Sequence, residues 1–403
     1  MKNLFIFRKN LFSLIVFLLS PALGVLTSLH NLKREHLRFF YILISMFFAI
    51  LVLKNPPIYD LYRYLEMFDI SASTTEFGNY YSYYILSKLF KNLGISFYFL
   101  PPLFVFLTIL YNLKSLHLLY EKFNWNLRKQ LILIFAVIII SNPLIISLGL
   151  RSYLSSALFT YSVLQISLNR EKKYYSLIIL SIFIHFSALY LTIFFLISRF
   201  IKIKKITALI ISILALTLSS IVIPYFIQYI PIASIQEHSL NYTNNQFTGI
   251  ENTSKSFNAL IVNNFSYFII IFFWILFYIK KSASNPYYND YKNILNFFSI
   301  AICLSSVTGL IFYRFSSYLI ILLFIYIATQ ELIFIKNKLS ISLITIILTL
   351  NLVLIDIFIR KDSIINGKPL QMAFLPTPQI LIYTDHEYRK FLNKIDDEGY
   401  IIK

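Results

Sequence analysis

The chain has 403 residues, of which 58% are hydrophobic and 13% are charged. Soluble domains carry about 45–50% apolar and about 25% charged residues, and they could not cover this much apolar surface. The composition excludes disordered, collagen-like and coiled-coil chains and predicts an all-α polytopic integral membrane protein. The basic residues that give the net charge of +18 lie in short loops between apolar runs. This pattern indicates that they set the membrane topology and contact anionic lipid headgroups, rather than that they bind nucleic acid.

Several apolar runs approach the roughly 20 residues that a membrane-spanning helix needs. They lie at residues 11–29, 37–53, 96–118, 130–148, 151–168, 206–227, 259–279, 294–311, 315–335 and 339–358. A further segment, 174–198, has basic loops at both ends, and two half-helices meeting near His185 would keep both loops on one side. We therefore expect about 10–12 transmembrane helices in a single membrane domain over residues 1–403.

Lysine and arginine are concentrated in one set of loops, such as 114–129, which should face the cytoplasm. The N-terminus, the loops 54–95 and 228–258 and a polar C-terminal tail at 359–403 then face outward. Residues 80–92 are too short and too polar to span, and they predict a Tyr-rich interfacial helix.

The first outer loop combines aromatic and acidic residues in a pattern that suits sugar. Two prolines end the preceding span, and Asp60 is placed to cap a short helix. At helical spacing Asp60 and Tyr64 share one face, and Tyr59 and Arg63 share another. Sugar C–H faces stack on tyrosine while hydroxyls bond to carboxylates. The alternative is a capped interfacial helix within an aromatic belt.

Two arginines occur in similar contexts, each at the outer end between two spans. Arg151 is followed by Ser152 and Tyr153, and Arg314 is followed after one residue by two serines and Tyr318. The guanidinium fork matches phosphate oxygens and keeps its charge when partly buried. Two such arginines at one membrane face could hold a diphosphate. The alternative is that they anchor helix ends by snorkelling.

His185 lies in an otherwise apolar run, where an ionisable side chain is costly. It could move a proton or bond a phosphate, or it could be tied to a backbone carbonyl inside the bundle. The sequence contains no Walker loop, no zinc-spaced His/Cys set and no G-x-S-x-G elbow, so we expect no metal and no cofactor. Acids at mid-membrane, typical of ion-coupled transporters, are few.

The order of these elements resembles the EpsG-like family of Wzy-type polysaccharide polymerases. Tyr59-Asp60-x-Tyr62-x-Tyr64 is similar to the family's Asp-Tyr…Tyr element, and Glu76 fits a further acidic position. Residues 313–318, Tyr-Arg-Phe-Ser-Ser-Tyr, match its late Tyr-Arg-hydrophobic-Ser-x-Tyr element.

Two other elements match with departures. Residues 150–154, together with the following Ser155, are similar to the family's Arg-Gln-x-Leu-Ala element, with Ser152 in place of glutamine and Ser155 in place of alanine. Residues 184–189 are similar to its Phe-His-Lys-Ser-Ala-Leu element, with Phe186 in place of lysine. These departures affect the detail of the polar site.

The resemblance implies a C-type glycosyltransferase-like membrane bundle in the bacterial plasma (inner) membrane, without nucleotide sugar or metal. It implies transfer of a glycan from undecaprenyl diphosphate to the non-reducing end of another lipid-linked repeat unit on the outer side. The product would be O-antigen, capsule or exopolysaccharide, and a chain-length regulator and a flippase are candidate partners. An O-antigen ligase, a polysaccharide transporter or flippase, and a scaffold without catalysis are the alternatives.

The chemistry of such a transfer assigns a role to each candidate residue. Arg151 and Arg314 would stabilise the diphosphate, and His185 or Asp60 would be the base for the attacking hydroxyl. The remaining substrate-binding candidates are Tyr62, Arg63, Tyr64, Glu76, Tyr153 and Tyr318. The sequence leaves open the sugars, the linkage and whether the anomeric centre inverts.

Overall fold

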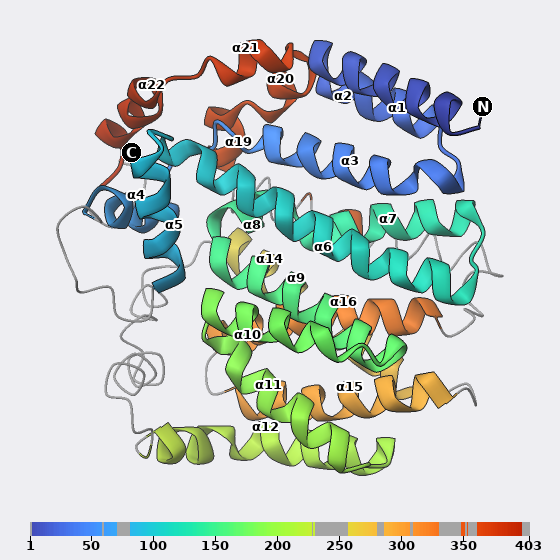
Figure 1. The fold of residues 1–403 in the computed structure, drawn as a ribbon. Helices are drawn as coiled ribbons and strands as arrows, with labels where there is room; N and C mark the ends of the chain where they lie inside the picture. Colours follow the sequence, from blue (N-terminus) through green and yellow to red (C-terminus); the bar gives the residue numbers. More distant parts are fainter. Residues whose placement is uncertain are drawn as a thin grey trace. The chain divides into compact units, whose positions relative to one another are not determined.

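The computed structural model describes the chain in several ranges. They are residues 2–58, 60–70, 81–227, 229, 257–279, 286–306, 309–329, 348–350, 353 and 361–396. Helices are the regular elements of these ranges (Figure 1), so the predicted all-α class is confirmed. The chain divides into two compact units, unit 1 with residues 1–77, 82–154 and 360–403, and unit 2 with 78–81 and 155–359. That they form a single membrane domain stays a prediction.

Unit 1 begins with a helical hairpin where the sequence predicts one span. Helix α1 (Lys2–Leu19) ends at Ser20, and α2 (Pro21–His30) packs back against it. Pro21 has no N–H for the carbonyl of Phe17, so the helix cannot continue unbroken. A Cβ on Gly24 would lie 2.3 Å from Cα of Phe17, so glycine permits the close approach of the two helices. The prediction of a single helix over 11–29 is therefore wrong.

The next apolar helices of unit 1 differ in length. After α3 (Leu37–Leu51), α6 (Leu100–Phe123) continues the short 3₁₀ turn at Phe97–Phe99. Among the described residues, Phe97–Phe123 is the one helix long and apolar enough to pass as a membrane span. The predicted span 130–148 is not one helix.

The break in 130–148 separates α7 (Leu127–Ser141) from α8 (Pro143–Leu148). Asn142 adopts φ 36°, a left-handed conformation that asparagine tolerates. Its Oδ1 accepts the N–H of Leu144 at 3.1 Å and so caps α8.

The outer-loop helices form where the sequence predicts them. They are α4 (Asp60–Ile70) and α5 (Tyr81–Asn92), the Tyr-rich helix. Glu76 lies outside the described residues, as do most of the loop 228–258 and most of the predicted span 339–358.

The C-terminal tail is folded onto unit 1, which the sequence did not predict. It forms α19 (Lys361–Gly367), α20 (Pro369–Phe374), α21 (Thr377–Leu381), α22 (Asp385–Arg389) and a 3₁₀ turn at Lys390–Lys394. The Thr377 hydroxyl donates to the carbonyl of Phe17 at 2.8 Å. The tail thereby satisfies the acceptor that Pro21 leaves without its helical partner.

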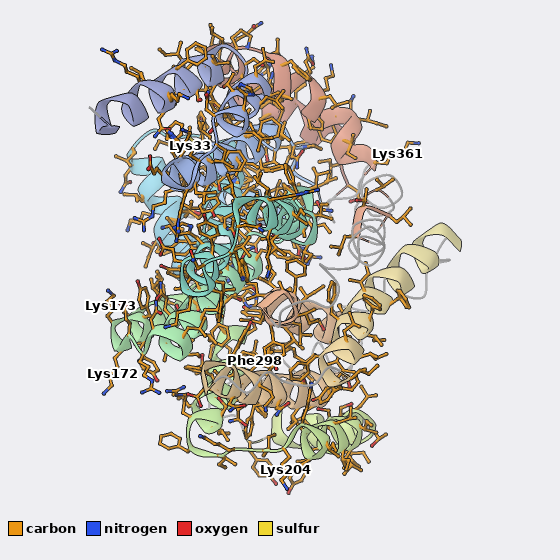
Figure 2. All side chains as sticks on the ribbon, turned by 90° about the vertical axis from the view of Figure 1, so that its right-hand side faces the viewer. Lys33, Lys172, Lys173, Lys204, Phe298 and Lys361 are labelled. Carbon is orange, nitrogen blue, oxygen red and sulfur yellow. The ribbon has the colours of Figure 1, made fainter. Side chains whose placement is uncertain are left out.

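Unit 2 contains most of α9 (Leu150–Leu164) and the helices that follow. They are α10 (Tyr175–Ile184), α11 (Ser187–Phe200), α12 (Lys205–Ile227), α14 (Phe257–Ile279), α15 (Pro286–Leu304) and α16 (Gly309–Thr329). Helix α15 packs against α11, α12 and α16, and its Phe298 is fully buried, whereas Lys172, Lys173 and Lys204 are exposed (Figure 2). The predicted break of 174–198 at His185 is confirmed.

Candidate functional site

Helix α4 presents a mixed surface because its side chains follow helical spacing. Leu61, Leu65 and Phe68 form the buried stripe. On the half-exposed side, the guanidinium of Arg63 lies 4.0 Å from the Asp60 carboxylate. Asp60 is the first residue of the helix, where a negative charge is favourable. The carboxylate predicted to bind sugar is therefore accessible.

Arg151 and Tyr64, predicted from two separate motifs, are in contact. Arg151 is only 8% exposed, and its Nε donates to the hydroxyl of Tyr64 at 3.3 Å, across 87 residues of sequence. Its guanidinium carbon is 5.7 Å from the centroid of the Tyr64 ring, a cation–π arrangement. The pair places a nearly buried positive charge beside a tyrosine of α4.

Tyr83 on α5 also contacts Tyr64. Its hydroxyl donates to the Tyr64 carbonyl, and the two ring centroids are 4.9 Å apart. Burial raises the pKa of Tyr83 well above its ordinary value, so the hydroxyl remains a donor. The sequence analysis missed Tyr83 because it lies in a run of tyrosines, Tyr80-Tyr81-Ser82-Tyr83-Tyr84, in which nothing marks one member.

The junction between α8 and α9 sets the position of Arg151. Asn55, after α3, donates to the Ser147 hydroxyl of α8 at 2.8 Å. Tyr153 lies against Gly149, where a Cβ would come within 2.9 Å of its ring. Arg151 is the second residue of α9, so its charge adds to the positive end of the helix dipole. This combination favours an anion such as phosphate.

In unit 2, His185 lies at one end of a hydrogen-bonded series of hydroxyls. Its Nδ1 is 2.5 Å from the Ser187 hydroxyl, which lies 3.1 Å from the hydroxyl of Tyr318. Tyr318 donates to Ser155 at 3.0 Å, and Ser155 donates to the Ser181 carbonyl at 2.8 Å. Three helical segments, α9, the α10–α11 break and α16, contribute to this hydroxyl series.

Two proton arrangements fit these distances, because a hydroxyl and an imidazole nitrogen can each donate or accept. In one, Nδ1 of His185 donates to Ser187, each hydroxyl donates to the next, and the lone pair lies on Nε2. In the other, the Ser187 hydroxyl donates to Nδ1, which also accepts the backbone N–H of Ser187 at 3.3 Å. The series therefore links the tautomer of His185 to the hydroxyl of Tyr318.

The remaining predicted residues are described less completely. Tyr62 and Tyr153 are half-buried and Arg63 is exposed. Arg314 lies on α16 one turn before Tyr318, and its side chain, like Tyr59 and Glu76, lies outside the described part of the chain. Arg151 belongs to unit 1 and Arg314 to unit 2.

The sequence analysis missed the two serines of the hydroxyl series as site residues. From the sequence, Ser155 was identified only as a departure from the family pattern, and Ser187 only as a position that matches it, without a role. Within the described ranges, no group of three or more His, Cys, Asp or Glu side chains could hold a metal ion.

The comparison with family models gives one match over most of the chain. Residues 37–375 match the model of the EpsG family. No curated protein and no solved structure matches the sequence. The matched range includes α4, Arg151, His185 and Tyr318, and it ends before α21 and α22.

Proposed function

The chain belongs to the EpsG family, a membrane-associated family of polysaccharide biosynthesis, and we propose that it is a Wzy-type polysaccharide polymerase. It transfers a glycan from undecaprenyl diphosphate to the non-reducing end of another lipid-linked repeat unit. The reaction takes place on the outer side of the bacterial plasma membrane, and the product is O-antigen or capsule.

The contact between Arg151 and Tyr64 carries the proposal. The transfer needs a cation for the diphosphate of the donor and a surface for the sugar of the acceptor. Arg151 is a nearly buried cation at a helix N-terminus, and it touches an aromatic residue of the outer-loop helix α4. We assign Arg151 to the diphosphate of the donor and α4, with Asp60, Tyr62 and Tyr64, to the acceptor sugar.

The chemical step needs little beyond charge stabilisation and a base. The acceptor hydroxyl oxygen attacks the anomeric carbon, the bond from that carbon to the diphosphate oxygen breaks, and the electron pair leaves with the diphosphate. Arg151 stabilises the charge that develops there. Arg314 has the same role by its sequence context.

We propose that Nε2 of His185 accepts the proton of the attacking acceptor hydroxyl. In the arrangement with Nδ1 as donor, the hydroxyl series through Ser187, Tyr318 and Ser155 ends on a backbone carbonyl. In that arrangement the lone pair lies on Nε2, and the series stabilises the imidazolium formed on protonation. Tyr318 then acts through His185. Asp60 is the competing candidate for the base.

Exposed apolar side chains support the membrane location. Helix α12 exposes a series of isoleucines and leucines, such as Ile206 at 74%, Ile213 at 50% and Ile221 at 69%, which suits contact with lipid acyl chains. We propose a multi-pass protein of the inner membrane with a C-type glycosyltransferase-like bundle. Its partners are the bilayer, the lipid-linked repeat units, a chain-length regulator and a flippase.

The test is the glycan ladder of a gene deletion complemented with wild type or Arg151→Ala. A polymerase predicts that deletion leaves single repeats, that wild type restores the ladder and that Arg151→Ala does not. Long chains that stay on the lipid carrier would instead identify a ligase. Loss of all carrier-linked glycan from the outer face would identify a transporter, and a normal ladder in the Arg151→Ala strain would refute the diphosphate assignment.

A further inference from the structure

The C-terminal tail reaches α4 through one charged contact. We call residues 383–394, which contain α22, the tail clamp. The guanidinium of Arg389 donates from both terminal nitrogens to the carboxylate of Asp69, each at 2.7 Å. The two residues are 320 positions apart. This is the fork geometry in which arginine–carboxylate pairs are strongest.

Asp69 lies at a position where a carboxylate does not stabilise α4. It is in the last turn of α4, at the negative end of the helix dipole, where an acidic side chain is unfavourable. Two cations compensate for it, because Lys91 of α5 donates to the Asp69 carbonyl at 2.7 Å and Arg389 holds the carboxylate. The carboxylate therefore serves the contact with the tail rather than the stability of α4.

Arg389 is held in place by the tail itself. Its Nε donates to Asp385 at 2.5 Å, and the neighbouring carboxylates of Asp69 and Asp385 raise the pKa of Arg389 above its ordinary value. In α22, Thr384 and Glu387 form a capping box. The guanidinium is thus preorganised, so little side-chain entropy is lost when it binds Asp69.

The tail clamp is anchored to the body of unit 1 by aromatic packing. Tyr388 is buried, with its ring centroid 6.0 Å from those of Phe97 and Tyr98. Tyr98 donates to the Tyr383 carbonyl at 2.6 Å. Phe97 also lies 5.5 Å from Phe68 of α4, centroid to centroid. The same aromatic cluster therefore touches both the tail clamp and α4.

We propose that Arg389 is a positioning residue for the acceptor-binding helix. An isolated helix of 11 residues, the length of α4, is marginal in water, so its place depends on its contacts. The tail clamp fixes the last turn through Asp69, and this holds Tyr64, in the preceding turns, against Arg151. The role of Arg389 in acceptor binding rests on the proposed function, whereas its role in holding α4 in place does not.

The position of α4 is measured first, without any assay of activity. In a Cys303→Ser background, spin labels are attached at Glu66→Cys on α4 and Lys88→Cys on α5, both exposed positions. We expect a wider inter-label distance distribution in Arg389→Gln and in Asp69→Asn, and no change in Lys390→Gln. Lys390 is the matched control because it is the exposed neighbouring cation. An unchanged distribution in Arg389→Gln overturns the proposal.

The effect on the reaction is measured with purified protein in proteoliposomes and lipid-diphosphate-linked repeat units. We expect Arg389→Gln to raise the KM for the acceptor repeat about tenfold with kcat within about twofold, and Arg389→Lys to recover part of the loss. The double variant with Asp69→Asn should be no worse than either single variant. A lower kcat at unchanged KM overturns the positioning role. If wild type extends no repeat while the label distances still respond, the proposed function fails and the hold on α4 stands.

Discussion

The two candidate sites of the molecule are built in different ways. In unit 2, His185 lies in a closed hydroxyl series in which Ser187, Tyr318 and Ser155 are bonded to one another and end on a backbone carbonyl. In unit 1, Arg151 meets the short helix α4, whose last turn is bonded to the C-terminal tail. One site is fixed by its own neighbours and the other by a distant segment.

This difference suits the two roles that the proposal assigns to the sites, namely the base and the binding of the acceptor. The action of a histidine base depends on its tautomer, and the hydroxyl series links the tautomer of His185 to the hydroxyl of Tyr318. An acceptor site must admit a lipid-linked repeat unit, so its helix is accessible and is held at its end. We therefore expect changes near His185 to act on the rate, and changes around α4 to act on binding.

The largest expected effect is at His185. His185→Ala should lower kcat by about 10²–10⁴, the usual contribution of a positioned acid or base, with normal protein levels. Tyr318→Phe should lower kcat less, by about tenfold, and shift its pH profile, because the Ser187 hydroxyl that bonds His185 loses its own partner. Tyr190→Phe is the matched control, since Tyr190 donates to the Ala301 carbonyl outside this series at 2.7 Å. Normal polymerisation by His185→Ala would refute the base assignment.

Arg151 should come next. Arg151→Ala is expected to lower the rate by about 10²–10³, as for loss of an electrostatic donor to the leaving group. Arg151→Lys should recover only part, since lysine lacks the fork. Chain elongation at saturating substrate measures the effect, and the exposed Arg128→Ala should behave as wild type. Equal losses of rate in Arg151→Ala and Arg128→Ala would indicate an effect of the overall positive charge and not of a specific site.

A smaller effect is expected on the folding of unit 1 from Thr377→Val. This change leaves the buried carbonyl of Phe17 without its donor, which costs about 1–3 kcal/mol of unfolding free energy. Thr377→Ser keeps the hydroxyl and should retain most of the stability. Thermal unfolding in detergent measures both variants, and equal midpoints for them would show that the hydrogen bond between the tail and α1 contributes little.

The smallest effect on stability is expected at Asp60. Its partner Arg63 is 4.0 Å away and both side chains are about half exposed, so Asp60→Asn should cost under about 1 kcal/mol. Any loss of activity then reports on chemistry, and we expect a higher KM for the acceptor at little-changed kcat. Glu66→Gln, another exposed carboxylate on α4, is the control. A large fall in kcat would transfer the base role from His185 to Asp60.

Local sequence information was sufficient for several elements of this chain. The start of α4 at Asp60 follows from the prolines and the acidic residue before an apolar stripe. The break at His185 follows from basic loops at both ends of one apolar run. Local sequence information did not predict the helix breaks at Ser20 and Asn142. Each break lies within a long apolar run, and the mean hydropathy of a window changes little with one proline or asparagine.

The sequence by itself determined the helical class, the outer-loop helix and the residues able to carry charge or a proton, because composition, capping and periodicity are properties of near neighbours. Only the tertiary structure decided which of them meet. Arg151 and Tyr64 are 87 residues apart, Tyr318 and Ser155 are 163 apart, and Arg389 and Asp69 are 320 apart. A serine or an aspartate carries no local signal of such a partner, since the contact exists only after the helices have packed.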